Sequence, residues 1–386
     1  MFEFQPSETQ EMMRDGARQY AERILAPRAA SLDHEGGFPE DSLRQAADLG
    51  LLGMNVPEEY GGVEAGAVAY ALAVMEMSRA CAATTVAMTV SNMVAEVICA
   101  FGTQAQREEH VTRLCSGEYV VGGFALSEAG AGSDPSRMLT KATRTNGGWS
   151  ITGNKLWITS GTHAGLFIVW ARTSDAPGAR GLSAFLVPGG APGLIRGKPE
   201  EKMGQHGSTT TPLELHEVEV GDDGLLGSEG DGFRIAMMAL DGGRIGIASL
   251  AFGVALGAHE FALDYAHERT QFGAPIMTFQ AIQWMLADNA TELDAMRLMT
   301  LNAAWLKDQG KPFTREASMA KLFASERGFE ICNRSLQVLG GYGYTREYPV
   351  ERALRDIRVT SIYEGTSQIQ RIVISRDIAR RFGGRS

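Results

Sequence analysis

Apolar residues recur at helical spacing in the first third of the chain and again in the last third, and shorter alternating runs separate these regions. Residues 7–118 are rich in Ala, Leu, Met and Glu, and breakers such as Pro27 and Pro57 interrupt them. This pattern is typical of short helices joined by turns. Residues 1–120 are therefore predicted to form an N-terminal α-helical domain.

Short runs of β-branched and aromatic residues, bounded by turn residues, occupy the middle of the chain. Such runs predict strands, here at 149–159, 166–170, 183–187 and 213–220. The apolar phase of the last run slips by one residue between Leu215 and Val218, which predicts a β-bulge near Glu217. Residues 121–231 are predicted to form a small β-barrel or sandwich domain.

Helical periodicity returns after Gly232. One face of a long predicted helix carries Ile282, Met285, Leu286, Leu293 and Met296. A last helix is predicted to begin at Thr366 as its N-cap and to bury Ile369, Ile372 and Val373. Residues 232–386 are thus predicted to form a C-terminal four-helix-bundle domain, and the whole chain is predicted to be a mostly helical α+β protein.

Composition and charge restrict the class of protein. Hydrophobic residues make up 44% and charged residues 21% of the chain, which is close to the globular average. The formal net charge of -10, without a basic block, argues against a nucleic-acid partner. Residues 1–6 lack the features of a signal peptide, and the apolar stretch 245–258 is too short to span a bilayer. No membrane association is therefore expected.

The cysteines are widely spaced and form no Cys-x-x-Cys pair. They are Cys81, Cys99, Cys115 and Cys332. This spacing favours free thiols in a reducing compartment over disulfides or a metal site. A cytoplasmic location without a bound metal is expected.

Three segments combine residue types suited to binding a nucleotide. The Gly-rich stretch 124–134 can present N–H groups to phosphate oxygens, or it can be an ordinary turn between domains. Residues 157–160 join a flat ring to hydroxyls, which suits a planar heterocycle, although local evidence favours core packing of Trp157. Residues 269–273 place Arg269 where a diphosphate could be bound, or where an arginine is simply solvated.

Two further segments lie near the C-terminus. Residues 337–344 place three glycines among aromatic residues, which indicates either close approach to a ligand or a Schellman ending of a helix. Residues 362–368 place Glu364 between apolar residues, directly before a predicted helix. A carboxylate in such a place can act as a base, although most glutamates are solvated surface charges.

The order and spacing of these five segments resemble those of the acyl-CoA dehydrogenase family along essentially the whole chain. Residues 125–134 (Ala-Leu-Ser-Glu-Ala-Gly-Ala-Gly-Ser-Asp) look like one family signature. Residues 337–356 (Gln-x-x-Gly-Gly-x-Gly-Tyr-x-x-Glu-x-x-x-x-Arg-x-x-x-Asp) look like the other. Trp-Ile-Thr at 157–159, Arg-x-Gln-Phe-Gly at 269–273 and Tyr-Glu-Gly-Thr at 363–366 are further matches in the same order.

The resemblance implies an FAD-dependent enzyme that converts an acyl-CoA thioester to the trans-2-enoyl-CoA. Glu364 would remove the α-proton, flavin N5 would take the β-hydride, and an electron-transfer flavoprotein would receive the electrons. Burial between Ile362 and Tyr363 can raise the pKa of the base. In this family FAD is bound across a subunit boundary, so a homotetramer is expected.

The resemblance also assigns binding residues. The flavin and ribityl end of FAD would be contacted by Phe124, Leu126, Ser127, Gly132, Ser133, Trp157, Ile158, Thr159, Thr366 and Gln368. The diphosphate and adenine end would be held by Arg269, Gln271, Phe272, Gln280, Gln337, Gly340 and Gly341. The acyl-CoA would contact Ser133, Asp241, Arg244 and Gly365.

Some positions depart from the family pattern. Pro135 and Arg137 follow the first signature where small residues are usual, and His206 stands where many relatives carry Arg. Some relatives carry their base on an earlier helix, at the place of Gly243. Because glycine has no side chain, Glu364 is left as the candidate base.

Three alternatives share these motifs: an acyl-CoA oxidase, an enzyme of another elimination on the same scaffold, and a non-enzymatic flavoprotein that binds nucleic acid. The net charge and the short tail 380–386 argue against the last of these. By resemblance, residues 82–95 would line the deep end of the acyl pocket. Their polar members favour a short or branched acyl chain, and they include Thr84, Thr85, Thr89 and Ser91 beside Met88.

Overall fold

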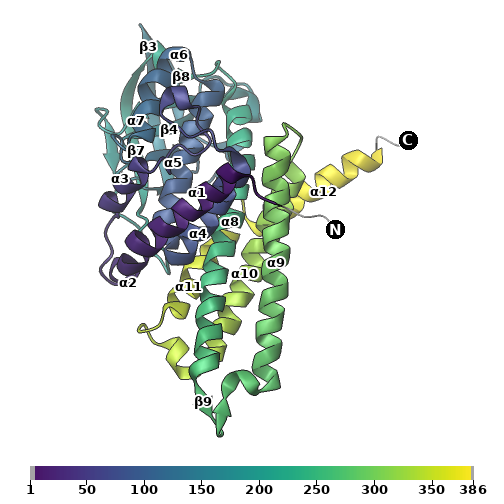
Figure 1. Ribbon diagram of the computed structural model, residues 1–386. Coiled ribbons are helices and arrows are strands. Elements are labelled where there is room, and N and C mark those ends of the chain that lie inside the picture. The colour runs from purple at the N-terminus through teal and green to yellow at the C-terminus, as the bar shows by residue number, and fades with distance from the viewer. Residues whose placement is uncertain (1–4, 384–386) are drawn as a thin grey trace.

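Helices fill both ends of the chain and strands fill its middle in the computed structural model, which describes residues 5–383. The predicted α+β class with three parts is confirmed (Figure 1). The prediction about the first residues of the chain falls largely on residues 1–4, which lie outside the described residues.

The N-terminal part is built from helices joined by short turns. The main helices are α1 (Glu8–Tyr20), α2 (Ala26–Glu35), α3 (Glu40–Asp48), α4 (Gly66–Ala80) and α5 (Ala82–Phe101). Shorter ones are η1 (Ala21–Leu25), η2 (Glu58–Tyr60), α6 (Gln104–Gln106), η3 (Arg107–Val111) and α7 (Thr112–Cys115). Ser7 caps α1 in a capping box with Gln10. All four cysteines are free thiols, as predicted.

The strands in the middle of the chain form one mixed sheet of eight strands, in which β6-β7-β3-β2-β4-β5-β8 lie in this order and β1 pairs in parallel with β4. They are β1 (Gly122–Ala125), β2 (Lys141–Thr145), β3 (Gly148–Thr159), β4 (Leu166–Arg172), β5 (Leu182–Pro188), β6 (Leu194–Arg196), β7 (Thr210–Gly221) and β8 (Leu225–Leu226). Short 3₁₀ turns lie at η4 (Pro135–Arg137), η5 (Gly178–Gly181) and η6 (Asp222–Gly224). All four predicted strand runs lie within β3, β4, β5 and β7.

The predicted bulge in β7 is confirmed. Ile151 pairs with Val218, whereas Gly153 pairs with Leu215, so β7 carries one residue more than β3 between these pairs. Glu217 within this step has a φ of 48°, a left-handed angle that occurs in one class of β-bulge.

The C-terminal part consists of three long helices and two shorter ones. They are α8 (Gly232–Glu268), α9 (Gln280–Asp308), α10 (Thr314–Leu339), α11 (Pro349–Arg358) and α12 (Ser367–Gly383). Short elements between them are β9 (Thr270–Gln271), β10 (Ala274–Pro275), η7 (Ile276–Thr278), η8 (Gly340–Tyr344) and η9 (Val359–Ser361). The long helices lie side by side and end in a tip formed by the β9–β10 hairpin, at the far end from the sheet (Figure 1).

The last helix begins as predicted but does not bury the predicted face. The Thr366 hydroxyl accepts a hydrogen bond from the Ile369 N–H at 3.2 Å, as an N-cap does. The prediction that Ile372 is buried is wrong, because 41% of its surface is exposed. The reason is that α12 projects from the body of the chain (Figure 1), so no other element covers this face.

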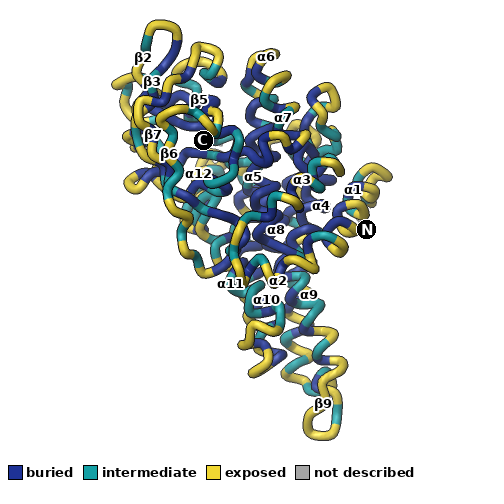
Figure 2. Tube along the Cα trace, turned by 90° about the vertical axis from the view of Figure 1, so that its left-hand side faces the viewer, coloured by how far each residue is buried: buried dark blue, intermediate teal, exposed yellow. Residues whose placement is uncertain are grey.

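The core lies around α5 and α8, which are buried along most of their length (Figure 2). Both helices are long and apolar enough to cross a membrane, and 78% of the apolar window of each is buried inside the chain. Core helices of folded domains pass the same test.

His206 joins the strand region to the N-terminal helices. Its ring nitrogens bind the backbone carbonyl oxygens of Asp33 and Lys202 at 2.9 and 2.8 Å. The Asp33 carboxylate also pairs with Arg355 of α11 at 2.6 Å. His206 therefore takes part in a contact that links three distant segments of the chain.

Candidate active site

Glu364 lies in a tight turn between η9 and α12. Glu364 and Gly365 both have left-handed backbone angles, with φ of 54° and 85°. The Gln370 side-chain amide donates hydrogen bonds to their carbonyl oxygens at 3.1 and 2.9 Å. The Lys321 ammonium group on α10 donates to the Gly365 carbonyl at 2.8 Å. Two helices therefore hold the turn in a conformation that a glutamate rarely adopts.

The carboxylate of Glu364 lies in an environment that favours its protonated form. Its Oε2 atom is buried and meets no hydrogen-bond partner among residues 5–383. Burial raises the pKa of Glu364 to about 7, and the charges of Arg244 and Lys321 oppose this shift. A carboxyl group with a pKa near neutrality can both accept and release a proton at physiological pH.

Gly243 on α8 makes room for this carboxylate. A Cβ atom at Gly243 would lie 2.7 Å from Glu364 Oε2 and 3.2 Å from the Met93 sulfur. The first distance is shorter than any real contact of this kind, so a side chain at this position would displace the carboxylate. The structure thus brings Gly243, a departure from the family pattern, against the predicted base.

Arg244 and Asp241, which the resemblance assigned to acyl-CoA binding, also lie at this site. Only 4% of the surface of Arg244 is exposed, and its guanidinium pairs with the Asp241 carboxylate. Asp241 also accepts a hydrogen bond from the Thr314 hydroxyl at 2.5 Å. The Nε atom of Arg244 has no partner among the described residues. The hydrogen-bonding capacity of this buried donor is therefore unused within the described chain.

A small cavity of about 110 Å³ adjoins Gly243. Its lining comes from α4, α5, α8, the end of α9 and the loop after it: Tyr70, Met93, Glu96, Val97, Met238, Ala239, Gly242, Gly243, Lys307 and Phe313. Of the stretch 82–95 expected to line the acyl pocket, only Met93 faces this cavity. The charged part of the wall is an ion pair between Glu96 and Lys307 at 2.5 Å, and Asn55 also donates to Glu96 at 2.8 Å.

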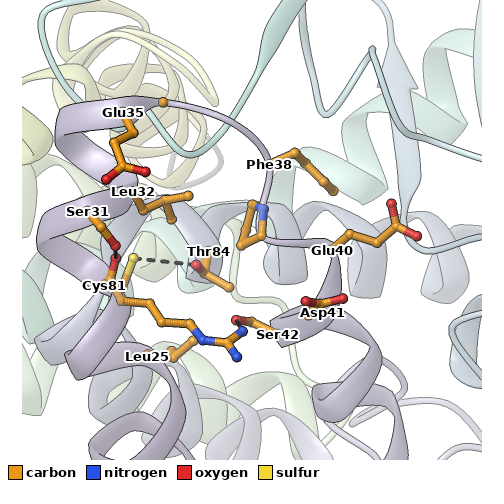
Figure 3. A pocket seen from close by; sticks show the side chains of 13 residues that line it. Leu25, Ser31, Leu32, Glu35, Phe38, Glu40, Asp41, Ser42, Cys81 and Thr84 are labelled. Atoms are coloured by element: carbon orange, nitrogen blue, oxygen red, sulfur yellow. Dashed lines mark hydrogen bonds between the residues drawn. The ribbon is translucent and has the colours of Figure 1, made fainter.

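A larger hollow of about 420 Å³ lies between α2, α3 and the start of α5 (Figure 3). Cys81 and Thr84 lie at one side of it, with 3.4 Å between their sulfur and hydroxyl oxygen. None of the predicted site residues lines this hollow. Size alone is therefore a poor guide to the site, and the smaller cavity lies against the residues that carry chemistry.

Two predicted FAD-binding segments lie side by side at the sheet. The Leu156 N–H donates to the Ser127 carbonyl at 2.9 Å. Lys155, which is fully buried, donates to the Leu126 carbonyl at 3.2 Å and pairs with Glu128 at 2.8 Å. These bonds fix the Gly-rich loop beside the end of β3.

Trp157 occupies a second bulge, which the sequence pattern did not reveal. Lys155 pairs with Leu213 and Ile158 with Thr211, so β3 carries an extra residue here. Trp157 has a φ of 62°, and 61% of its surface is exposed, whereas Ile158 is buried. The bulge turns the ring of Trp157 out of the sheet, where a flat ligand could stack on it.

A separate group of predicted residues lies at the far tip of the helical bundle. The Arg269 guanidinium lies 5.6 Å from the centre of the Tyr342 ring, which brings 269–273 beside the turn at 340–344. Phe272 is 95% exposed. Gly340 and Gly341 have open space around them. Within one chain this group does not meet the residues at the sheet, because the bundle separates them (Figure 1).

The residues at the sheet fit a flavin nucleotide. A large exposed ring, open glycines at 130 and 132, and the buried hydroxyl of Ser160 without a partner among the described residues leave stacking and hydrogen-bonding capacity unused. A planar polar heterocycle would satisfy this capacity.

The sequence analysis missed Lys321, Gln370 and Tyr70, which surround the turn of Glu364 or the cavity. Lys321 and Gln370 are fully buried polar residues. Each lies in a helix that also carries polar residues on its surface, so the sequence around it does not distinguish a buried polar residue from an exposed one. Their partners lie far along the sequence or in an irregular turn, which only the fold reveals.

Comparison with known proteins agrees with these observations. Residues 7–118, 123–218 and 230–379 match the families described as the N-terminal, middle and C-terminal domains of acyl-CoA dehydrogenase. The short-chain specific acyl-CoA dehydrogenase of Bos taurus, a mitochondrial protein, is 46% identical over 376 residues, which cover 97% of this chain and 91% of the relative.

Solved structures are similar along their whole length. Butyryl-CoA dehydrogenase from Megasphaera elsdenii has a TM-score of 0.96 at 38% identity, covering 98% of this chain and 100% of its own. A chain from work on the electron transferring flavoprotein of Acidaminococcus fermentans has a TM-score of 0.97 at 41% identity, with the same coverage of 98% and 100%. An FAD complex of PigA has a TM-score of 0.94 at 26% identity, again covering 98% and 100%. The chain therefore belongs to the acyl-CoA dehydrogenase family and is an FAD-dependent oxidoreductase.

Proposed function

We propose that this protein dehydrogenates short-chain acyl-CoA esters between the α and β carbons, and that Glu364 removes the α-proton. The observation that carries the proposal is the buried Glu364 Oε2 atom, which has no partner among the described residues and lies against Gly243, beside a small cavity. A buried carboxylate without a hydrogen-bond partner is free to accept a proton from a bound substrate. The α-carbon of a thioester can supply this proton, because its C–H bond is acidic.

The other residues of the site would orient the thioester. The backbone N–H of Glu364 donates to no acceptor within residues 5–383 and could meet the charge that develops on the thioester oxygen. Arg244, with its orphaned Nε, and Asp241 would hold the polar part of the acyl-CoA, together with Ser133 and Gly365. An acyl chain in the cavity would exclude water from Glu364 and keep its pKa raised.

FAD, when bound, supplies the acceptor for the β-hydride. We propose that the residues at the sheet, among them Trp157 and the loop 126–133, hold the flavin end. The group around Arg269 at the tip of the bundle would hold the diphosphate and adenine end of FAD in a second subunit. This arrangement, and the exposed apolar residues Ile372 and Ile378 on α12, support a homotetramer. We also propose an electron-transfer flavoprotein as acceptor, which the similarity to the Acidaminococcus fermentans chain supports.

Acyl chain length is expected to be limited by the Glu96–Lys307 wall. A cavity of about 110 Å³ holds about three or four groups of the size of a water molecule. Butyryl-CoA should therefore exceed octanoyl-CoA in kcat/KM by about 10-fold or more, since each misplaced methylene can cost about 10-fold. A series of straight-chain acyl-CoA esters, assayed with a dye acceptor, measures this.

A substitution in the Glu96–Lys307 pair tests whether this pair limits chain length. Glu96→Ala should open the end of the cavity and so reduce the ratio of kcat/KM for butyryl-CoA to that for octanoyl-CoA. Glu214→Ala, at an exposed position on β7, should leave this ratio unchanged. A wild-type protein that prefers octanoyl-CoA would disprove the short-chain assignment while leaving the dehydrogenation itself intact.

Arg269→Ala is expected to weaken the retention of FAD, because a charged contact with the diphosphate would be lost. The purified wild-type protein should be yellow, and the variant should lose flavin during extensive dialysis and assemble less completely. Flavin absorbance per chain and size-exclusion chromatography measure both effects. Arg297→Ala, which removes an exposed arginine from α9, is the matched control. Full flavin content in Arg269→Ala would show that the assignment of Arg269 is wrong.

A further inference from the structure

Lys321 is a fully buried lysine on α10 that the proposed reaction leaves without a role. None of its surface is exposed, and its Nζ atom makes one hydrogen bond, to the Gly365 carbonyl oxygen at 2.8 Å. No carboxylate within residues 5–383 forms an ion pair with it. A buried charge without an ion partner is costly, and an apolar residue of the same volume usually serves stability as well or better.

The other fully buried lysine of the described chain provides a contrast. Lys155 pairs with the Glu128 carboxylate at 2.8 Å and also donates to the Leu126 carbonyl at 3.2 Å. These contacts compensate its charge and hold the Gly-rich loop to β3. Lys155 therefore has a structural explanation within its own surroundings, and Lys321 does not.

The contact of Lys321 is directed at the turn that carries Glu364. The left-handed conformation of Glu364 costs energy and persists only where surrounding contacts impose it. Gln370 supplies such contacts from α12, and Lys321 supplies the one from α10. The position of the Glu364 carboxylate therefore depends on both helices.

The charge of Lys321 also reaches Glu364. The ionisable groups that face Glu364 are Arg244 on α8, Tyr70 on α4, Lys321 on α10 and the adjacent Tyr363. Arg244 already has Asp241 as its partner, so Lys321 is the cation of this group that has no carboxylate of its own. Burial raises the pKa of Glu364, and the charge of Lys321 opposes that shift. Burial lowers the pKa of Lys321 to about 7, and the charge of Glu364 opposes that shift in turn.

We propose that Lys321 is a positioning residue for the base: its hydrogen bond to Gly365 fixes the turn of Glu364, and its positive charge favours the ionised carboxylate. The inference rests on the proposed role of Glu364 as the base. Part of the reactivity of Glu364 would then be set by Lys321, a residue 43 positions earlier in the chain.

Two variants separate the hydrogen bond from the charge. Lys321→Gln can still donate to Gly365 but carries no charge, and Lys321→Met lacks both functions. Flavin reduction by butyryl-CoA in the holoenzyme, followed anaerobically across pH, reports the ionisation of the base, and thermal unfolding reports stability. In both variants the acid limb of the rate should move to higher pH by about one unit. Near neutral pH this shift corresponds to a rate about fivefold lower.

The plateau at high pH should then distinguish the variants. Lys321→Gln should approach the wild-type plateau, whereas Lys321→Met should remain about tenfold below it, because the turn is held less firmly. Lys321→Met should unfold at or above the wild-type temperature, and Lys155→Met should unfold well below it.

An acid limb that stays in place in both variants would overturn the proposal, and so would failure of both variants to fold, since that result shows a structural role. A different result would show that Glu364 is not the base. In that case Glu364→Gln would keep the wild-type rate of flavin reduction and its acid limb, independently of the results for the Lys321 variants.

Discussion

Replacing Glu364 by Gln should reduce the rate of flavin reduction by acyl-CoA by about 10² to 10⁴, the usual contribution of a general base. Glutamine keeps the shape of the side chain but cannot accept the α-proton, so FAD and acyl-CoA should still bind. The acid limb of the wild-type rate should disappear as well. The wild-type rate is expected to fall as pH drops below the pKa of Glu364, about 7, because the protonated carboxyl cannot act as a base.

Anaerobic stopped-flow measurement of flavin absorbance with butyryl-CoA gives both quantities. Glu330→Gln, at an exposed position on α10, is a control for the loss of one carboxylate, and it should reduce the flavin at the wild-type rate. Reduction of Glu364→Gln at a near wild-type rate would mean that another residue is the base. Gly243, the place of the base in some relatives, could not be that residue.

Gly243→Ala should lower the rate of flavin reduction by about 10², because displacement of a reacting group by about 1 Å has this order of effect. The new methyl group would lie 2.7 Å from Glu364 Oε2, so the carboxylate must move. Alanine is also a better helix former than glycine by about 1 kcal/mol. The variant is therefore expected to fold as stably as the wild type while losing activity.

Gly16→Ala in α1 is the matched control for this substitution. An added Cβ atom at Gly16 would meet no neighbouring side chain within 4 Å, and the change in helix propensity is the same. Its rate should remain within about threefold of the wild type, as expected of a change that leaves the reacting groups in place. Equal activity of Gly243→Ala and Gly16→Ala would contradict the placement of Gly243 against the carboxylate.

The sequence predicted those parts of the fold that local periodicity encodes. Apolar spacing identified α9, where Leu286, Leu293 and Met296 are buried, and a single phase slip located the bulge at Glu217. The bulge at Trp157 was missed because Leu156, Trp157 and Ile158 are all apolar, so the sequence shows no slip in the alternation of apolar and polar residues. Only the strand pairing reveals the extra residue in β3. The burial of α12 was overestimated, because periodicity cannot say whether an apolar face is covered within its own chain.

The site was predicted where a motif marks it and missed where three-dimensional packing creates it. Glu364 was identified because Tyr-Glu-Gly-Thr at 363–366 resembles the family pattern, since most glutamates between apolar residues are ordinary surface charges. Lys321 appears in the sequence as one more lysine in an amphipathic helix, and its burial arises because the turn at 364–365 folds over α10. The separation of Arg269 from Trp157 within one chain is likewise a property of the long bundle, which no single segment encodes.

The most direct test of the account is the anaerobic reduction of the wild-type flavin by butyryl-CoA that carries deuterium at the α-carbon. If Glu364 removes the α-proton, bleaching of the flavin should be markedly slower than with unlabelled butyryl-CoA, and enoyl-CoA should form in equal amount to reduced flavin. The rate should also fall below a pH of about 7. Equal rates for the two esters with no dependence on pH, or no bleaching at all, would contradict the central claim.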